Sequence, residues 1–126
     1  MVRKAIVEER KGPLNGTGVL TYRHIANADE LKPAGRLLAH IIVPPGASIG
    51  VHRHHGETEP YYILKGEADF TDADGTVKRV QAGDCCLIAD GESHGIANNG
   101  TEDMEMIAMI YNTGTEQGHA EPVTSR

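Results

Sequence analysis

Histidine and glutamate residues with the spacing of metal ligands lie in the middle of this 126-residue chain. His52 and His54 are two positions apart, so on a β-strand both imidazoles lie on the same face. Glu59 follows after a short loop, and His94 stands at the start of a later predicted strand. Three neutral imidazoles and one carboxylate suit a divalent ion, and an octahedral ion would keep two positions for water or substrate. These residues are therefore predicted to hold one metal ion.

Two neighbouring residues compete with this ligand set. Glu57 has the same parity as Glu59, but it falls in the predicted loop, where a carboxylate is usually solvated, so it is the weaker candidate. His55 would point away from His54 on a continuing strand, which makes it a solvent-facing side chain rather than a ligand.

Proton transfer at such a site would need a further side chain, and His40 and Tyr61 are the candidate catalytic residues. His40 could point into a cavity from the predicted strand 37–43, although an ordinary hydrogen-bonded histidine is the simpler interpretation. Tyr61 follows Glu59 by two positions, so alternation places both on one face. Tyr22 and His24 share a face of an earlier strand and could also line a pocket.

The segment around the first ligands resembles the first motif of a known family, the cupins. That motif consists of Gly, five residues, His-x-His, three or four residues, Glu, six residues and Gly. The chain matches it, with the four-residue gap, at Gly46, His52, His54, Glu59 and Gly66. The gap to Glu59 favours this residue over Glu57 as the ligand.

A second segment resembles the second cupin motif, in which Gly, five residues, Pro-x-Gly, two residues, His, three residues and Asn follow one another. The chain matches it at Gly83, Gly91, His94 and Asn98. Ala89 stands where proline is usual, which loosens a turn without touching the metal ligands. The two motifs span residues 46–98, and the strands around them extend the likeness over most of the chain.

The resemblance implies an all-β fold, a single cupin-type double-stranded β-helix or jelly-roll barrel. It also implies a divalent metal ion in the mouth of the barrel, and usually a homodimer. The whole chain, residues 1–126, is interpreted as one compact domain of bacterial type, with a barrel core at about 17–111 and peripheral termini. Mn, Fe, Ni, Zn, Co and Cu all suit these ligands.

Two classes of function are compatible with such a site. The first is a metal-dependent oxygenase, isomerase or decarboxylase that acts on a small oxygenated metabolite, with the metal as Lewis acid or redox centre. The alternative is a non-catalytic module that binds a small ligand or a metal. The resemblance does not choose between them, because the cupin barrel hosts many chemistries and also non-enzymes.

The pattern along the chain supports the all-β prediction. Short apolar runs alternate with Gly, Pro, Asn and Asp, as expected for an antiparallel sandwich or barrel. One helical turn is predicted at 27–31, and the Asp-Gly at 74–75 predicts a hairpin. The predicted strands are Val19–Ile25, Leu37–Val43, Gly50–His54, Pro60–Lys65, Ala68–Thr71, Thr76–Gln81, Cys85–Ile88, Gly95–Asn98 and Met104–Tyr111.

Other segments are expected to be structural or peripheral. Met104, Met106 and Met109 are interpreted as core filler of the last strand. The charged cluster at 8–11 is interpreted as solvated, and the first dozen residues and 113–126 as poorly ordered or lying along the surface.

The composition and charge of the chain argue against some classes of partner. Twelve Lys and Arg against 18 Asp and Glu give a net charge of −6, which argues against a duplex nucleic-acid binder. No apolar run is long enough for a transmembrane helix, and no secretory signal is recognisable at the start. Cys85 and Cys86 are adjacent and cannot join distant segments, so a cytoplasmic location is expected. A small-molecule ligand or substrate is the expected partner.

Overall fold

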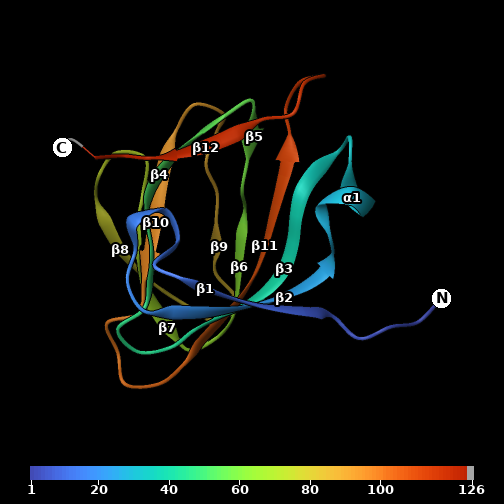
Figure 1. Ribbon diagram of the computed structural model, residues 1–126. Helices are drawn as coiled ribbons and strands as arrows, with labels where there is room; N and C mark the ends of the chain where they lie inside the picture. Colours follow the sequence, from blue (N-terminus) through green and yellow to red (C-terminus); the bar gives the residue numbers. More distant parts are fainter. Residues whose placement is uncertain (125–126) are drawn as a thin grey trace.

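Two antiparallel β-sheets make up most of the computed structural model, which describes residues 1–124 (Figure 1). One sheet has the strand order β1-β2-β3-β11-β6-β9, with β5 also paired to β11, and the other has the order β12-β4-β10-β7-β8. The strands are β1 Ile6–Lys11, β2 Val19–Ala26, β3 Gly35–Val43, β4 Ser48–His55, β5 Glu57–Thr58, β6 Tyr61–Lys65, β7 Glu67–Thr71, β8 Val77–Gln81, β9 Cys85–Cys86, β10 Ser93–Ala97, β11 Met104–Asn112 and β12 His119–Pro122. The predicted all-β jelly-roll architecture is confirmed.

The predicted turns and strands correspond closely to the observed elements. Each of the nine predicted strands overlaps an observed one, although β9 is shortened to Cys85–Cys86. The helical turn is α1, Ala28–Leu31, which Asn27 and Glu30 close with a reciprocal capping box. The hairpin between β7 and β8 is also present. Of the helices in the described residues, none is long and apolar enough to cross a membrane.

The terminal segments agree with one of the two expected alternatives, since they lie along the surface, and parts of both join the sheets. β1 pairs with β2 over its whole length, and β12 pairs with β4, so that Ala120 lies opposite His54. The backbone of a polar segment can complete a sheet edge even where its side chains are solvated. Interpreting these segments as poorly ordered is therefore wrong for both strands; residues 125–126 lie outside the described part.

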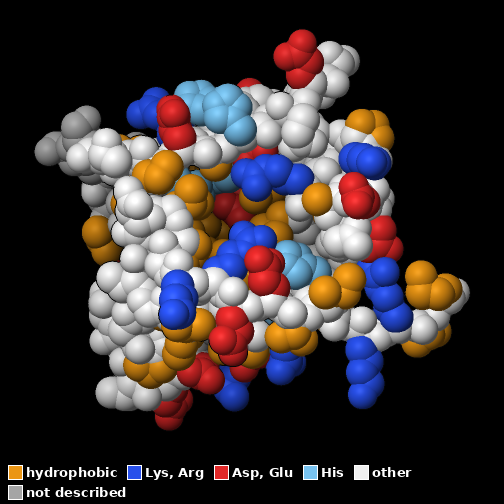
Figure 2. All heavy atoms as spheres, in the orientation of Figure 1, with side chains coloured by type: hydrophobic (Ala, Val, Ile, Leu, Met, Phe, Trp, Pro, Cys, Tyr) orange, Lys and Arg blue, Asp and Glu red, His pale blue; other side chains and the backbone are white. Residues whose placement is uncertain are grey.

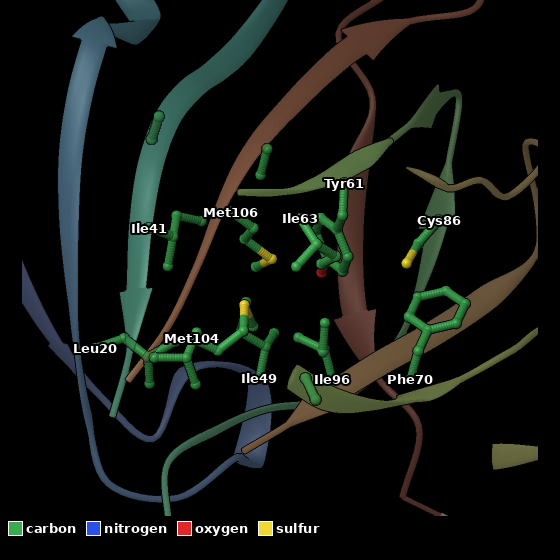
Figure 3. Packing of buried hydrophobic residues seen from close by; sticks show 14 of the residues in the cluster. Leu20, Ile41, Ile49, Tyr61, Ile63, Phe70, Cys86, Ile96, Met104 and Met106 are labelled. Carbon is green, nitrogen blue, oxygen red and sulfur yellow. The ribbon is translucent and has the colours of Figure 1, made fainter. Parts of the chain in front are cut away.

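The apolar core lies between the inner faces of the two sheets (Figure 3). Burial alternates strictly along β3, as expected for a strand with one face on the core. On β11 the same alternation buries Met104 and Met106 but turns Met109 outward, where it is 37% exposed. The interpretation of Met109 as core filler is wrong, because it is an odd number of positions from the two buried methionines.

A short 3-10 helix, η1, Pro13–Asn15, packs closely on β4 near the predicted ligands. Gly50 makes this approach possible, because a Cβ atom at this position would overlap the carbonyl oxygen of Leu14. The segment before β2 therefore becomes part of the wall around the ligand-bearing strand.

Candidate metal centre

The predicted ligand residues converge on one buried point between the sheets. His52 and His54 lie on β4, and His94 lies on the neighbouring β10, directly opposite His52 in the strand register. Glu59 comes from the connection between β5 and β6. All four side chains are buried, and together they form a group that could hold a metal ion.

The distances within this group fit a single ion. The Nε2 atom of His94 lies 3.0 Å from that of His52 and 3.2 Å from that of His54. The Oε1 atom of Glu59 lies 3.1 to 3.4 Å from the three imidazole Nε2 atoms. An ion about 2.1 Å from each ligand atom would separate neighbouring ligand atoms by about 3.0 to 3.4 Å. The spacing therefore suits a group that could hold a metal ion.

Hydrogen bonds on the far side of two imidazoles determine which nitrogen faces the centre. Nδ1 of His52 donates to the carbonyl oxygen of Gly50 at 2.6 Å, and Nδ1 of His54 donates to Oε2 of Glu57 at 2.6 Å. In the neutral rings Nε2 is then unprotonated, so two nitrogen lone pairs point at the Glu59 oxygen. Lone pairs that meet in this way repel one another unless a cation lies between them, which is the chemistry of a metal site.

The third imidazole is held differently. Nδ1 of His94 is buried and has no hydrogen-bond partner among the described residues. Its ring instead stacks on Tyr61, with centroids 4.8 Å apart and planes inclined by 13°, and meets the edge of Phe70 at 5.8 Å. On the Nδ1 side of the ring, aromatic packing rather than a hydrogen bond therefore orients His94.

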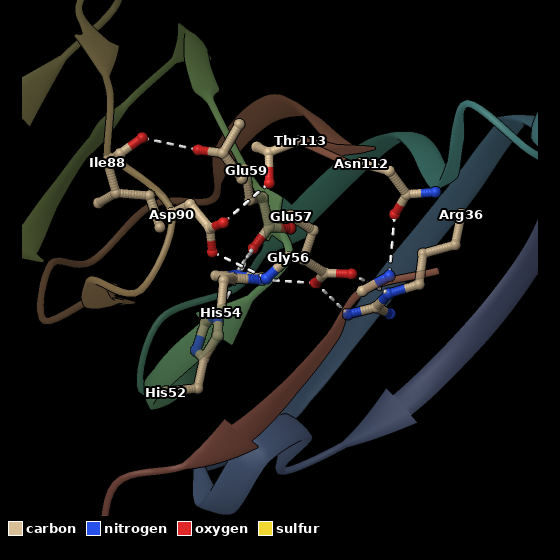
Figure 4. A network of polar contacts seen from close by, with 12 residues as sticks. Arg36, His52, His54, Gly56, Glu57, Glu59, Ile88, Asp90, Asn112 and Thr113 are labelled. Carbon is tan, nitrogen blue, oxygen red and sulfur yellow. Dashed lines mark hydrogen bonds and ion pairs between the residues drawn. The ribbon is translucent and has the colours of Figure 1, made fainter. Parts of the chain in front are cut away.

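Glu57 has a structural role that the sequence analysis missed. Its side chain is 0% exposed in β5, and it accepts hydrogen bonds from Nε and Nη2 of Arg36 at 2.8 and 2.7 Å as well as the bond from His54 (Figure 4). The interpretation of Glu57 as a solvated loop carboxylate is wrong, because β5 pairs with β11 and carries the residue inward. Glu57 is outside the ligand group and supports His54 from behind.

The charges in this cluster shift the pKa values of its members. Burial by itself lowers the pKa of His54, but hydrogen bonds to Glu57 and Glu59 raise it to about 9. Burial would raise the pKa of Glu59, yet hydrogen bonds from the three histidines hold it well below its usual value. Burial lowers the pKa of His94. Without an ion, a proton on His54 partly neutralises the two carboxylates; a metal ion would replace it.

Of the two candidate catalytic residues, the structure brings Tyr61 close to the ligand group but not His40. His40 faces away from the core on β3, and its Nε2 atom pairs with Oε1 of Glu105 at 2.7 Å. The hydroxyl of Tyr61 lies 3.3 Å from Glu59 and 3.4 Å from His94, but the side chain is buried and does not line the cavity in front of the ligands. Burial and the nearby Glu59 carboxylate raise the pKa of Tyr61, so its hydroxyl is protonated.

A cavity of about 460 Å³ opens in front of the ligand group. His52, His54 and Glu59 line its inner end, and Tyr22 lines its wall, as the sequence suggested. In Figure 2 a hollow with acidic atoms at its floor opens between Lys or Arg side chains. The remaining lining residues are Arg10, Lys11, Pro13, Leu14, Arg36, Leu37, Ile49, Ile110 and Ala120.

Sequence reasoning missed the cationic part of this cavity. Arg36 directly precedes the predicted strand 37–43, and Arg10 and Lys11 lie in the cluster interpreted as solvated. Residues 6–11 do not alternate between polar and apolar, so the sequence gives little sign of a strand there. No local signal therefore placed these cations at the site. His24, in contrast, does not line the cavity and bonds to Glu8 at 2.7 Å.

Comparison with known proteins agrees with this architecture. The family model for the Cupin domain matches residues 39–110. An oxalate-binding protein of Thermotoga maritima is 42% identical over 95 residues, which are 75% of this chain and 78% of the relative. The chain belongs to the cupin family.

Solved structures extend the similarity to nearly the whole fold. A crystal structure described as a predicted oxalate decarboxylase from Thermotoga maritima matches with a TM-score of 0.82 and 38% identity, over 89% of this chain and 98% of that one. A Cupin 2 conserved barrel domain protein from Salinispora arenicola matches with a TM-score of 0.63 and 26% identity, over 75% and 76%. The double-stranded β-helix is thus common to the chain and these neighbours.

Proposed function

We propose that this protein binds one divalent metal ion through His52, His54, Glu59 and His94 and uses it to hold a small carboxylate ligand, with oxalate as the first candidate. The observation that carries the proposal is the convergence of three imidazole Nε2 atoms on a buried carboxylate at the inner end of a cavity. A bound divalent ion would act there as a Lewis acid for ligand oxygens.

The residues around the cavity favour an anionic ligand. Three imidazoles and one carboxylate would leave a divalent ion with one net positive charge. Arg36 lines the cavity, and Glu57 engages only its Nε and Nη2 atoms, so Nη1 has no partner among the described residues. A guanidinium edge of this kind suits a carboxylate. The similarity to a protein named as oxalate-binding supports the same ligand class.

Binding without turnover is the function that these groups support best. Loss of carbon dioxide from oxalate requires a proton at the carbon that remains, and an acid must deliver it. Glu59 is the one carboxylate that lines the cavity within the described residues, and it belongs to the ligand group. His40 faces away, and Glu57 is already paired with Arg36 and His54. Metal-dependent decarboxylation, oxygenation or isomerisation is therefore the second candidate.

The test begins with metal analysis of the purified protein and titration of the metal-free form with Mn, Fe, Ni, Zn, Co and Cu. About one ion per chain is expected, followed by calorimetric binding of oxalate that requires the ion. Failure of every metal to bind at His52, His54, Glu59 and His94 would contradict the proposal. Formation of formate or consumption of oxygen by the oxalate-loaded protein would favour the enzyme over the binding module.

We also propose that the chain is a homodimer, as the family resemblance implies, and that it is cytoplasmic, as the cysteines suggest. An apolar groove on the outer face of the first sheet, which includes Leu38, Tyr62, Leu87 and Met109, supports an association of two copies. Both cysteines are free, as expected in a reducing compartment. Light scattering of the purified protein should give twice the chain mass, and a monomer at micromolar concentration would contradict the dimer.

A further inference from the structure

The cavity is longer and more varied than oxalate requires. Oxalate consists of two joined carboxylates, and both would be used at the metal and the adjacent Arg36. The cavity of about 460 Å³ lies within the range for larger metabolites, and residues other than these groups also line it. An unused volume next to a chelating site indicates a ligand with additional atoms.

Part of the cavity wall is apolar. Leu37 and Ile110 from one sheet, Ile49 from the other, and Leu14 from η1 line it. Leu37, Ile49 and Ile110 are nearly fully buried and belong to the core, so their positions are set by packing. A methylene chain would find favourable contacts along this wall, whereas a second polar group there would lose its hydration.

Two further cations, Arg10 and Lys11, also line the cavity. The guanidinium of Arg10 lies over the ring of Tyr22, 4.1 Å from its centroid, which fixes it above the cavity wall. Its Nε and Nη2 atoms contact one oxygen of Glu8, which also bonds His24. Lys11 also lines the cavity and takes part in no described ion pair. Two cations against Glu8 make this part of the wall net positive.

We infer that the natural ligand is a dicarboxylic acid longer than oxalate, with a 2-oxo or 2-hydroxy acid end at the metal, a short methylene chain along Leu37, Ile49 and Ile110, and a second carboxylate at Arg10 and Lys11. The inference rests on the proposed metal-dependent binding of carboxylates, and it specifies the ligand class. The three parts of the ligand correspond to the three kinds of residue that line the cavity: metal-ligating, apolar and cationic.

The test compares three ligands on the metal-loaded protein by calorimetry: oxalate, 2-oxohexanoate and 2-oxoadipate. The two oxo acids have the same chain length and differ only in the terminal methyl or carboxylate group. We expect 2-oxoadipate to bind about fivefold more tightly than 2-oxohexanoate, as suits a charge contact at partly exposed cations. 2-Oxoadipate should also bind more tightly than oxalate, since it fills the apolar wall.

Two variants locate the second carboxylate. Arg10→Gln should reduce the preference for 2-oxoadipate to less than about twofold. Arg23→Gln is the control, because Arg23 is a cation on the adjacent strand β2 but does not line the cavity. This variant should keep the full preference for 2-oxoadipate. Because the preference is a ratio within one variant, and metal content and thermal unfolding are measured on the same samples, partial misfolding cannot imitate the result.

The outcomes separate the two proposals. If oxalate binds in a metal-dependent way but the two oxo acids bind equally, or if oxalate binds most tightly, the longer ligand is excluded and the proposed function stands. If none of the three binds the metal-loaded protein, the proposed function fails and the longer ligand fails with it. A preference that persists in Arg10→Gln and disappears in Arg23→Gln would overturn the placement of the second carboxylate.

Discussion

Two histidine–glutamate pairs have nearly the same contact distance, but one is buried between the two sheets and the other lies on the outer face of one sheet. His54 and Glu57 are joined at 2.6 Å, and both side chains are 0% exposed. His40 and Glu105 are joined at 2.7 Å, but their side chains are 23% and 24% exposed. The first pair supports the candidate metal site, and the second lies on the outer face of β3 and β11.

The comparison shows that environment decides what such a contact does. Water competes for the partly exposed pair, so it contributes little to stability. The buried pair belongs to a chain of contacts from Arg36 through Glu57 to His54 and then to the ligand group. A carboxylate that accepts the outer N–H of a ligating imidazole fixes the tautomer and the ring orientation.

The largest difference is expected in metal content, when His54 and His40 are each replaced by alanine. His54→Ala deletes a predicted ligand, so metal content is expected to fall to the background level in elemental analysis. His40→Ala should bind metal as the parent protein does, since its side chain faces away from the cavity. Loss of metal from His40→Ala together with an intact fold by circular dichroism would break the distinction between the pairs.

Removing the two carboxylates should give the next largest effect. Glu57→Ala leaves Arg36 and His54 without their shared partner, which should lower the free energy of unfolding by about 3 kcal/mol and weaken metal binding about 10- to 100-fold. Glu105→Ala, the matched control, should cost less than about 1 kcal/mol. Chemical denaturation and metal titration measure both quantities, and equal effects from the two variants would show that burial does not separate the pairs.

The pH dependence tests the charge on His54. Its pKa is raised from 6.5 to about 9, and a metal needs the unprotonated nitrogen. Apparent metal affinity should therefore fall about tenfold per unit as the pH decreases from 9 to 7. In the metal-free protein the raised pKa contributes stability that is fully present below about pH 6.5 and is lost as the pH rises through about 9.

The matched variant for this titration is Glu57→Gln, which keeps an acceptor near Nδ1 of His54 but removes the negative charge. The fall in affinity should then begin at a lower pH than in the parent protein. An affinity that does not change between pH 9 and pH 7 would mean that His54 carries no proton in the metal-free site.

The smallest effect is expected at His94, which has no carboxylate behind it. Tyr61→Phe keeps the ring that stacks on His94 and removes the hydroxyl near Glu59. If packing alone orients His94, metal affinity should change less than about threefold, as a titration can measure. A loss as large as that of Glu57→Ala would show that the hydroxyl is needed at the site.

Much of the fold could be predicted because it depends on local rules. The alternation along residues 37–43 and 104–111, and the turn residues between strands, are properties of neighbouring positions. Met109 shows the limit of the interpretation, since the same alternation, applied strictly, turns it outward. The strands β1 and β12 have little apolar alternation, and they form because the edges of β2 and β4 are available for pairing.

The sequence by itself determined the candidate ligand group, because the spacing of His52 and His54 and the two motifs indicate three imidazoles and a carboxylate at metal-ligand spacing. Only the tertiary structure decided which residues surround that group. Glu57 faces inward because β5 pairs with β11, and Arg36 meets it across 21 positions of the chain. Arg10 reaches the cavity because β1 adds to the edge of β2. Such contacts depend on strand pairing between distant segments, which local periodicity does not encode.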